Sequence, residues 1–551
     1  MFTSIIVVIL YFLYFLKMIK LKYIVSLLVV ATFFTNCAKR GTITGGPKDT
    51  IAPKIIGSLP ANFSTQFKGN EIKITFDELI KVKDVTKQLI ISPPLKKQPI
   101  IVPQSSASKF ISIKLLDTLQ ENTTYSFNFG QSITDNNENN PYSQFKYVFS
   151  TGNYIDSLSV VGKIKDAYKQ KPDNFVSILL YDAKTFTDST VYKQTPLYVT
   201  NTLDSLQLFS LENLKEGSYQ IIALKDKSGN NKFDPKSDKI GFLSEPITLP
   251  TSTAYELELF AEKPQFKAFK PTQESNNKLY LGYEGNAKNL KVTAKKRGES
   301  IPLRMTNYPQ KEKDTVQLFF PKMELDSLEI TVEDGSYTKS FTSKLKNLKS
   351  SDSLKIIAKT QGVLSFRDQL TLTTNTPIDK IDVSKMVLRN KDSVAVNFTA
   401  KYDEYQQEIR FDFKKEEEEK YTLELLPEAI TDFYESKNDS LQFEVNTKLL
   451  ADYGNLKVTL SGVKRFPIIL EVLDENGEVL YSKASQKETA MLFETIEPKL
   501  YTLRVIYDDN GNGIWDTGDY LAKRQAEEIV YYAKLLDVRA NWDVEQDFNL
   551  D

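Results

Sequence analysis

One acidic loop near the C-terminus has residue types and a spacing that suit calcium. In the segment DDNGNGIWDTGD (508–519), acidic and amide side chains recur at positions 1, 3, 5, 9 and 12, and a glycine stands at position 6. Calcium takes roughly six to eight oxygen ligands, and alternate residues of a tight loop direct their oxygens inward. The predicted ligands are the side chains of Asp508, Asn510, Asn512, Asp516 and Asp519 and the backbone carbonyl of Ile514.

A plain turn is the alternative, because side-chain hydrogen bonds within such a turn use the same Asp, Asn and Gly residues. An EF-hand has glutamate at its last ligand position and a helix on each side, whereas this loop ends in Asp519 and joins strand-like segments. We therefore expect bound calcium to have a structural role, holding the loop against a neighbouring module. A weaker copy lies in DKSGNNKFDPKSD (226–238), with predicted ligands Asp226, Ser228, Asn230 and Asp234.

The composition excludes most catalytic chemistry. The 551 residues include no histidine, so the chain lacks Ser-His-Asp and Cys-His nucleophile systems, imidazole bases and His-ligated zinc or iron. A single cysteine excludes disulfides within the chain and thiolate metal clusters. Lysine and arginine total 71 against 72 acidic residues, so the net charge favours no nucleic-acid partner. No spacing singles out a carboxylate pair of the glycosidase kind, and we predict no enzyme.

The first 50 residues predict export and a lipid anchor. Residues 1–36 hold two apolar runs separated by lysines and are predicted to be a signal peptide. We expect the true start of translation to be Met18, within this segment. Cys37 directly follows the second run, in the segment FTNC, which resembles the lipobox of bacterial lipoproteins but lacks the small residue preferred before the cysteine. The resemblance implies acylation of Cys37, membrane lipid as a partner and an outer-membrane location. Residues 37–50 are predicted to be a flexible tether.

Beyond residue 50 the pattern predicts an all-β chain. Apolar and polar residues alternate with a period of two, as in half-buried antiparallel strands, and clusters of Asn, Asp, Gly and Pro separate the runs. Many short strands with regular turn signals favour β-sandwiches. Clear examples of the alternation are Ile72-Ile74-Phe76, Ile111-Ile113-Leu115 and Tyr125-Phe127-Phe129.

Two internal duplications divide the chain. Both copies of the first have a strand tyrosine, Tyr125 or Tyr421, before an Ile-Thr-Asp turn. Both copies of the second have a tyrosine, Tyr219 or Tyr501, seven residues before the aspartate that opens an Asp/Asn/Gly loop. The first duplication pairs 74–94 with 370–390 and 123–140 with 419–438, and the second pairs 208–226 with 492–508.

The segment DTIAPKIIGSLPANFS (49–64), followed by ITFDELI (74–80), resembles the SbsA-type bacterial Ig-like domain of surface-layer and cell-surface proteins. The second duplicated unit is similar to prealbumin-like or carboxypeptidase-regulatory-like sandwiches. These resemblances imply architecture and location and no catalytic residue. The predicted order is an Ig-like domain at 51–152, a prealbumin-like sandwich at 153–262, a β-domain of unassigned type at 263–358, a second Ig-like domain at 359–449 and a second prealbumin-like sandwich at 450–551.

We predict a non-enzymatic, lipid-anchored cell-envelope protein. Its five β-sandwich modules are expected to form a structural or adhesive rod with calcium-stiffened loops. The alternative is a glycan-binding accessory protein of the cell surface, which requires two or three exposed aromatic residues on one face. A cell-surface protein or a glycan is therefore the expected further partner. We expect both tryptophans, Trp515 and Trp542, to pack in the interior.

Overall fold

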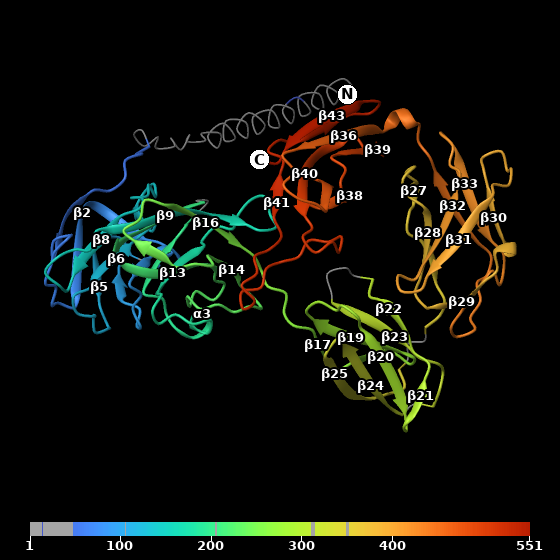
Figure 1. The fold of residues 1–551 in the computed structure, drawn as a ribbon, viewed down its shortest axis with the longest axis horizontal. Helices are drawn as coiled ribbons and strands as arrows, with labels where there is room; N and C mark the ends of the chain where they lie inside the picture. The colour runs from blue at the N-terminus through green and yellow to red at the C-terminus, as the bar shows by residue number, and fades with distance from the viewer. Residues whose placement is uncertain are drawn as a thin grey trace, which may run out of the picture.

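The computed structural model describes Tyr14 and residues 48–104, 106–203, 207–309, 314–324, 326–348 and 352–551. Cys37 and most of the predicted signal and tether lie outside the described residues. The regular secondary structure of the described chain is almost entirely β-strand, arranged as a string of β-sandwiches as predicted (Figure 1). We number these sandwiches modules 1 to 5 in chain order.

Module 1 spans Ile55 to Ser150 and forms around the predicted alternation. In β2, Ile72, Ile74 and Phe76 are fully buried while the residues between them face outward, because alternate side chains of a strand point to opposite faces. One sheet has the order β1-β2-β5-β4 with β7 beside β2, and the other has the order β3-β6-β8. The elements are β1 (Ile55–Leu59), β2 (Glu71–Val82), α2 (Val85–Gln88), β3 (Ile90–Ser92), β4 (Ile100–Val102), β5 (Ser108–Lys114), β6 (Thr124–Asn128), β7 (Ile133–Asp135) and β8 (Lys146–Ser150).

Module 2 has two sheets, of order β12-β9-β16 and β11-β10-β13-β14, with β15 beside β13. Strands β16 and β9 pair in parallel, while the other pairs are antiparallel. Both faces of the larger sheet are covered, so strand β10 is buried along Ile178 to Tyr181. The elements are β9 (Leu158–Asp166), β10 (Ser177–Asp182), α3 (Thr190–Lys193), β11 (Tyr198–Asn201), β12 (Leu208–Leu214), β13 (Gly217–Lys225), β14 (Lys239–Phe242), β15 (Ile247–Leu249) and β16 (Ala254–Leu259).

Module 3 is a two-sheet β-structure with its own core, built on Leu279, Leu281, Val316, Leu318 and Ile330. One sheet has the order β17-β19-β23-β22 with β18 beside β19, and the other has the order β21-β20-β24-β25. The elements are β17 (Lys267–Ala268), β18 (Thr272–Ser275), β19 (Lys278–Glu284), β20 (Lys291–Lys296), β21 (Glu299–Ile301), β22 (Arg304–Asn307), β23 (Thr315–Phe319), β24 (Ser327–Asp334) and β25 (Tyr337–Lys344).

Module 4 repeats the sheet pattern of module 1, with sheets of order β26-β28-β32-β31 and β27-β35-β33-β30 and a small pair β29-β34. Strand β26 lies just before the predicted boundary at 359 and pairs with β28. The elements are β26 (Ile356–Ala358), β27 (Gly362–Val363), β28 (Leu370–Thr374), β29 (Ile378–Ile381), η1 (Val383–Lys385), β30 (Met386–Arg389), β31 (Phe398–Asp403), β32 (Glu408–Phe413), β33 (Lys420–Leu425), β34 (Ile430–Asp432) and β35 (Leu441–Asn446).

Module 5 repeats module 2 strand for strand. Its sheets have the order β39-β36-β43 and β38-β37-β40-β41, with β42 beside β40, and β43 again pairs in parallel with β36. The elements are η2 (Leu450–Asp452), β36 (Gly454–Ser461), β37 (Ile468–Leu473), β38 (Val479–Ser485), β39 (Ala490–Ile496), β40 (Lys499–Tyr507), β41 (Ile529–Tyr531), β42 (Leu536–Val538) and β43 (Asp543–Asn549).

The duplications extend to individual side-chain hydrogen bonds. In modules 2 and 5, the hydroxyls of Tyr219 and Tyr501 each donate to the backbone carbonyl four residues earlier. In modules 1 and 4, the hydroxyls of Tyr125 and Tyr421 each accept from the backbone N–H five residues earlier, at 2.9 and 2.7 Å. These matched bonds explain why tyrosine stands at the same strand position in each copy.

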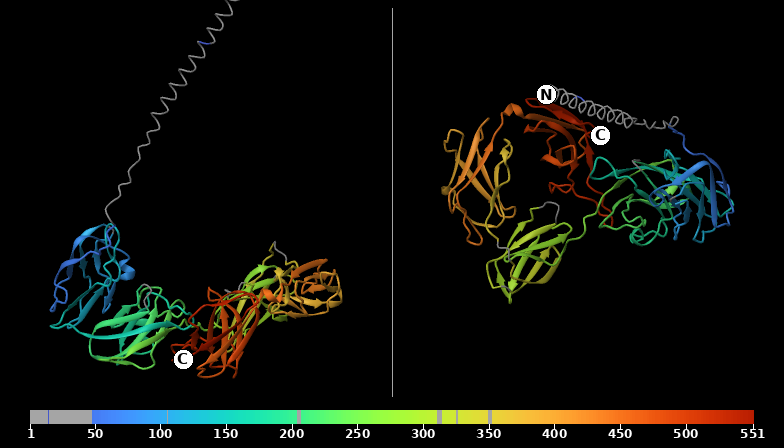
Figure 2. Two further views of the ribbon diagram at one scale, coloured as in Figure 1. Left: turned by 90° about the horizontal axis from the view of Figure 1, so that it is seen from above. Right: turned by 180° about the vertical axis from the view of Figure 1, so that it is seen from behind.

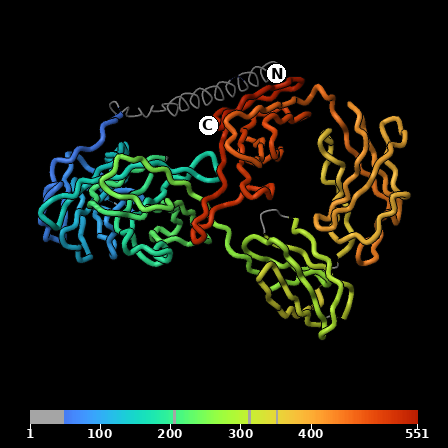
Figure 3. Tube along the Cα trace, viewed as in Figure 1, coloured from blue at the N-terminus to red at the C-terminus, as the bar shows by residue number. Residues whose placement is uncertain are grey.

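The modules do not form the extended rod that we predicted. Modules 1 and 2 lie side by side, module 3 follows, and module 4 leads back to module 5, which contacts module 2 (Figures 1 and 2). The trace shows a loop of the C-terminal module extending to the second module (Figure 3). The chain therefore closes on itself, through contacts between residues more than 250 positions apart.

Candidate functional site

One part of the contact between modules 2 and 5 is made by the segment 508–528, which joins β40 to β41 and which we call the clasp loop. It contains the predicted calcium segment and extends beyond it. At its centre Tyr520 is 1% exposed and inserts into aromatic side chains of module 2. We call these side chains the aromatic socket: Tyr192, Phe233, Phe242 and Phe260.

The geometry of Tyr520 in the socket is that of edge-to-face aromatic packing. Its ring centre lies 5.3 Å from that of Phe242 and 6.4 Å from that of Phe233, with interplanar angles of 84° and 76°. Such pairs contribute about 0.5–1.5 kcal/mol each beyond the area that they bury. Burial raises the pKa of the Tyr520 hydroxyl above its usual range. Gly518 lies against Phe260, and a Cβ at this position would come within 2.5 Å of the ring, so the approach requires glycine.

Hydrogen bonds fix the clasp loop to the segment that leaves module 2. The Thr517 hydroxyl donates to the Ala261 carbonyl at 2.7 Å, and the Tyr520 N–H donates to the Glu262 carboxylate at 2.6 Å. Burial raises the pKa of Glu262, although the Tyr520 N–H opposes this shift. At the rim, Lys523 forms an ion pair with Asp188 of module 2.

A second part of the interface surrounds Arg504 of β40, which is 1% exposed. Its guanidinium donates to the Tyr168 hydroxyl at 2.9 Å and to the Glu471 carboxylate at 2.6 Å, and it lies 4.3 Å from the centre of the Tyr168 ring. Burial opposes the charge on Arg504, but the Tyr168 hydrogen bond and the Glu471 charge outweigh it and raise the pKa. The Tyr531 hydroxyl also donates to the Tyr168 carbonyl, at 2.6 Å.

The two tryptophans differ from each other. Trp515 packs against Tyr168, with ring centres 4.7 Å apart, and its indole N–H donates to the Glu527 carbonyl, so the prediction of packing is confirmed for this residue. The same prediction is wrong for Trp542, which is 55% exposed and lies beside the Arg539 guanidinium.

The structure brings four of the predicted calcium ligands together. Asp508 accepts from the N–H groups of Asn512 and Gly513 at 3.0 and 2.9 Å. The side-chain amides of Asn510 and Asn512 both donate to the Asp516 carboxylate. Asp519 is turned away into the next bend, where it accepts from the Ala522 N–H, and the side chain of Ile514 is 53% exposed.

The copy in module 2 has the same local bonding. Asp226 accepts from the N–H groups of Ser228, Gly229 and Asn231 at 2.9, 2.7 and 2.6 Å. The side-chain oxygens of Asn230 and Asp234 each accept from the N–H two residues later. Among the described residues, no three His, Cys, Asp or Glu side chains gather in a way that could hold a metal ion. Calcium binding at both loops therefore stays a prediction.

Chelation separates the two interpretations of the clasp loop. If calcium binds there, EGTA should lower the melting temperature of module 5, because a ligand at about 100 times its Kd stabilises the folded state by about 2.7 kcal/mol. Asp516→Asn should abolish the calcium-dependent part of the melt. A melting curve that is the same in EGTA and in calcium would assign the loop to its own hydrogen bonds.

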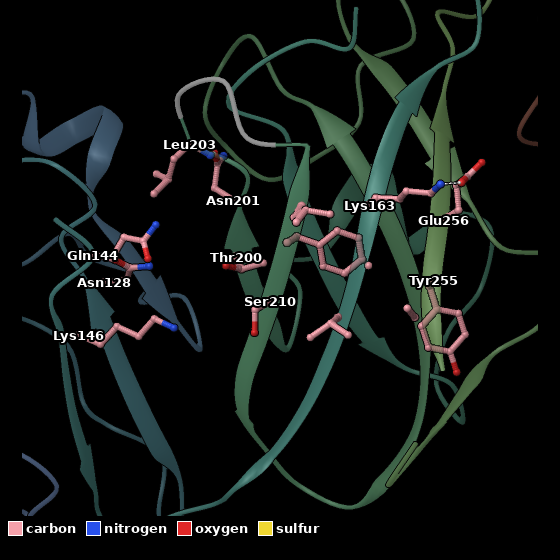
Figure 4. A pocket seen from close by; sticks show the side chains of 15 residues that line it. Asn128, Gln144, Lys146, Lys163, Thr200, Asn201, Leu203, Ser210, Tyr255 and Glu256 are labelled. Carbon is pink, nitrogen blue, oxygen red and sulfur yellow. Dashed lines mark hydrogen bonds and ion pairs between the residues drawn. The ribbon is translucent and has the colours of Figure 1, made fainter. Parts of the chain in front are cut away.

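A groove between modules 1 and 2 is the second candidate site. Its cavity volume is about 690 Å³. Its module 1 wall carries Asn128, Gln144 and Lys146, which lie opposite the module 2 side chains shown in Figure 4. The floor includes the exposed apolar side chains of Val161 and Leu208. The other lining residues are Gly162, Lys163, Thr200, Asn201, Leu203, Phe209, Ser210, Ala254, Tyr255 and Glu256.

The charges in this groove are paired. Lys146 forms an ion pair with Glu212 at 2.8 Å, and Lys163 forms one with Glu256 at 2.6 Å. The remaining polar lining consists of amides and hydroxyls, which suit a neutral hydroxylated ligand better than an anion. Within the described lining of this groove, the predicted set of two or three exposed aromatic residues is not present, because the groove offers Tyr255 and a Phe209 that is 4% exposed.

Residues 49–151 match the family model of the bacterial Ig-like domain. This match supports the Ig-like character predicted for module 1, and its SbsA type stays a prediction. No curated protein matches the sequence. Among the described residues, no helix is both long and apolar enough to span a bilayer.

Similar solved structures are β-rich proteins of low sequence identity. The S-layer protein rSbsC(31-844) is 13% identical, with 88% of this chain and 67% of that chain covered and a TM-score of 0.14. The pilin subunit BcpA of Bacillus cereus is 11% identical, with 71% and 99% covered and a TM-score of 0.13. The SGBP-B protein of a Bacteroides ovatus mixed-linkage glucan utilization locus is 10% identical, with 69% and 95% covered and a TM-score of 0.19.

Proposed function

We propose that this chain is a non-enzymatic, lipid-anchored protein of the cell envelope, in which five β-sandwich modules form a closed structural or adhesive framework. The observation that carries the proposal is the docking of the clasp loop in the aromatic socket. This contact fixes the distance between modules 2 and 5, which a flexible string would leave free. A chain in which a buried aromatic contact holds two modules together is suited to support and display surfaces.

Two features of the sequence support the same function. The family of module 1 is that of bacterial Ig-like domains. Cys37 follows an apolar run, and the rest of the sequence has no other cysteine and no histidine. Acylation of Cys37 would hold the modules at a membrane, and in a cell with two membranes we expect the outer one.

Replacing Cys37 with serine tests the anchor. Because serine cannot carry the thioether-linked lipid, the Cys37→Ser protein should leave the membrane fraction and appear in the soluble fraction. Immunoblots of separated membrane and soluble fractions measure the change. A replacement of the neighbouring Asn36 by alanine is the matched control and should leave the protein with the membrane. A Cys37→Ser protein that stays in the membrane fraction would remove the lipid anchor from the proposal.

Glycan binding is the second candidate function, and the groove between modules 1 and 2 is the observation that favours it. Amide and hydroxyl side chains from two modules line a space of about 690 Å³ whose charges are paired. These groups can donate to and accept from sugar hydroxyls, and Val161 and Leu208 offer an apolar floor.

Affinity gel electrophoresis tests this second function. A neutral polysaccharide in the gel should retard the unmodified protein. Gln144→Ala combined with Asn128→Ala should raise the apparent Kd for the polysaccharide by roughly 5- to 150-fold, since each lost hydrogen bond costs about 0.5–1.5 kcal/mol. Replacement of the remote Gln442 by alanine is the control. Equal mobility with and without each polysaccharide tested would count against a glycan site in the groove.

A further inference from the structure

Modules 1 and 2 form one half of the molecule. Lys146 of module 1 pairs with Glu212 of module 2, the Lys215 ammonium donates to the Asn122 carbonyl, and the Val199 N–H donates to the Ser92 hydroxyl at 3.1 Å. Strands β3 and β11 also lie beside each other across this junction. These contacts join strands and loops of both modules.

Modules 3, 4 and 5 form the other half. Between modules 3 and 4, Arg304 pairs with Asp379 and Glu404 at 2.8 and 3.1 Å, and the Tyr434 hydroxyl donates to the Asn277 carbonyl. Between modules 4 and 5, the Arg367 guanidinium donates to the Glu494 carbonyl at 2.6 Å and lies over the Tyr481 ring.

The two halves are joined by a short linker. Phe260 belongs to the core of module 2 and Phe266 to that of module 3, so residues 261–265 connect them. Between modules 2 and 3, outside the linker, Lys236 and Glu284 form an ion pair at 3.4 Å whose lysine side chain is 64% exposed, and such pairs contribute little. The linker is thus the position at which the halves can rotate.

The clasp loop holds this linker as well as the socket. Thr517 and Tyr520 bond to Ala261 and Glu262, the first two residues of the linker. When the clasp loop leaves the socket, the linker loses these bonds in the same step. Docking and the linker conformation are therefore coupled.

We propose that the clasp loop of one copy docks in the aromatic socket of a second copy, giving a dimer with exchanged halves. Undocking exposes both Tyr520 and the socket, and the exposed apolar surfaces favour pairing again. The second copy offers the identical complementary surface, including the Asp188 partner of Lys523, so exchange needs no new contact. Docking within one chain has an effective concentration of the millimolar order, and exchange becomes measurable as the protein concentration approaches it.

Two single-cysteine proteins test the exchange, in a Cys37→Ser background that leaves no other cysteine. One carries Lys523→Cys and the other carries Asp188→Cys. These positions face each other across the interface, and their side chains are 45% and 53% exposed. The proteins are mixed, incubated at high concentration and treated with a short bismaleimide. Docking between copies should raise the yield of the product that joins the two chains above the level that random collisions give.

The control mixes Lys523→Cys with a protein that carries Lys109→Cys, at a remote and exposed position. We expect at least about tenfold more mixed dimer from Lys523→Cys with Asp188→Cys than from the control, since docking raises the local concentration of the reacting groups. Adding Tyr520→Ala should remove the excess. A protein with both Lys523→Cys and Asp188→Cys must also cross-link within one chain at low concentration. Mixed dimer at the control level, or failure of this internal cross-link, would overturn the proposal. The test does not depend on the lipid anchor, because the anchor is absent.

Discussion

Replacing Tyr520 with alanine should open the closed arrangement of the modules. The side chain is 1% exposed and contacts three rings of module 2, so its removal leaves a hole at the centre of the interface. Truncation of such a central aromatic residue costs about 2–4 kcal/mol of docking free energy. Small-angle X-ray scattering should show a larger radius of gyration for Tyr520→Ala than for the unmodified protein.

Tyr520→Phe is the matched control. Among the described residues the Tyr520 hydroxyl is buried without a hydrogen-bond partner, so phenylalanine keeps the ring and removes a desolvated polar group. We expect this variant to stay closed and to be as stable as the parent or slightly more so. A Tyr520→Ala protein with the same scattering curve as Tyr520→Phe would show that the clasp loop does not hold the modules together.

Replacing Arg504 with alanine should destabilise module 5 by about 3–5 kcal/mol, because the mutation breaks a buried ion pair and leaves one charge behind. The partner that remains is Glu471, whose side chain is 14% exposed. The hydrogen bonds from Arg504 to Tyr168 of module 2 are lost as well. Urea unfolding followed by a module 5 probe measures the change.

A double variant without either charge identifies the cause of this loss. Arg504→Met combined with Glu471→Leu leaves no unpaired charge. The free energy of unfolding of this double variant should recover most of what Arg504→Ala loses. Docking should stay weakened, because the bonds to Tyr168 are still missing. A double variant as unstable as Arg504→Ala would place the effect in lost packing and not in the stranded carboxylate.

The sandwiches themselves could be predicted because their signals are local. In β2 and β6 the alternation of buried and exposed residues follows the sequence, with Ile72, Ile74 and Phe127 fully buried. The duplicated tyrosines also predict matching structure, and Tyr219 and Tyr501 make the same bond four residues back.

The sequence contains a weaker signal for the contact between modules 2 and 5, which the prediction of a rod did not use. Strand β10 contains the uninterrupted apolar run Ile178 to Tyr181, and its copy β37 contains Ile468 to Leu470. A strand with one face in solvent alternates, whereas an unbroken run indicates that both faces are covered. The run shows that a cover exists, but no local pattern shows that the cover of module 2 comes from Tyr520.

The candidate sites were harder to predict for a related reason. The spacing of Asp508, Asn512 and Asp516 suits a metal, but the same groups also satisfy each other's hydrogen bonds, and spacing does not distinguish these outcomes. The groove between modules 1 and 2 brings together Gln144 and Asn201, which belong to different modules. Their juxtaposition depends on how the modules pack.

The position of Tyr520 in the sequence has a consequence for biosynthesis. A ribosome completes the socket at Phe260 but reaches its cover only 260 residues later, at Tyr520. At about 5–20 residues per second, this delay is roughly 10–50 s. During that interval the apolar aromatic socket of module 2 is exposed to solvent. A premature stop before residue 508 would leave this surface without its cover from the same chain.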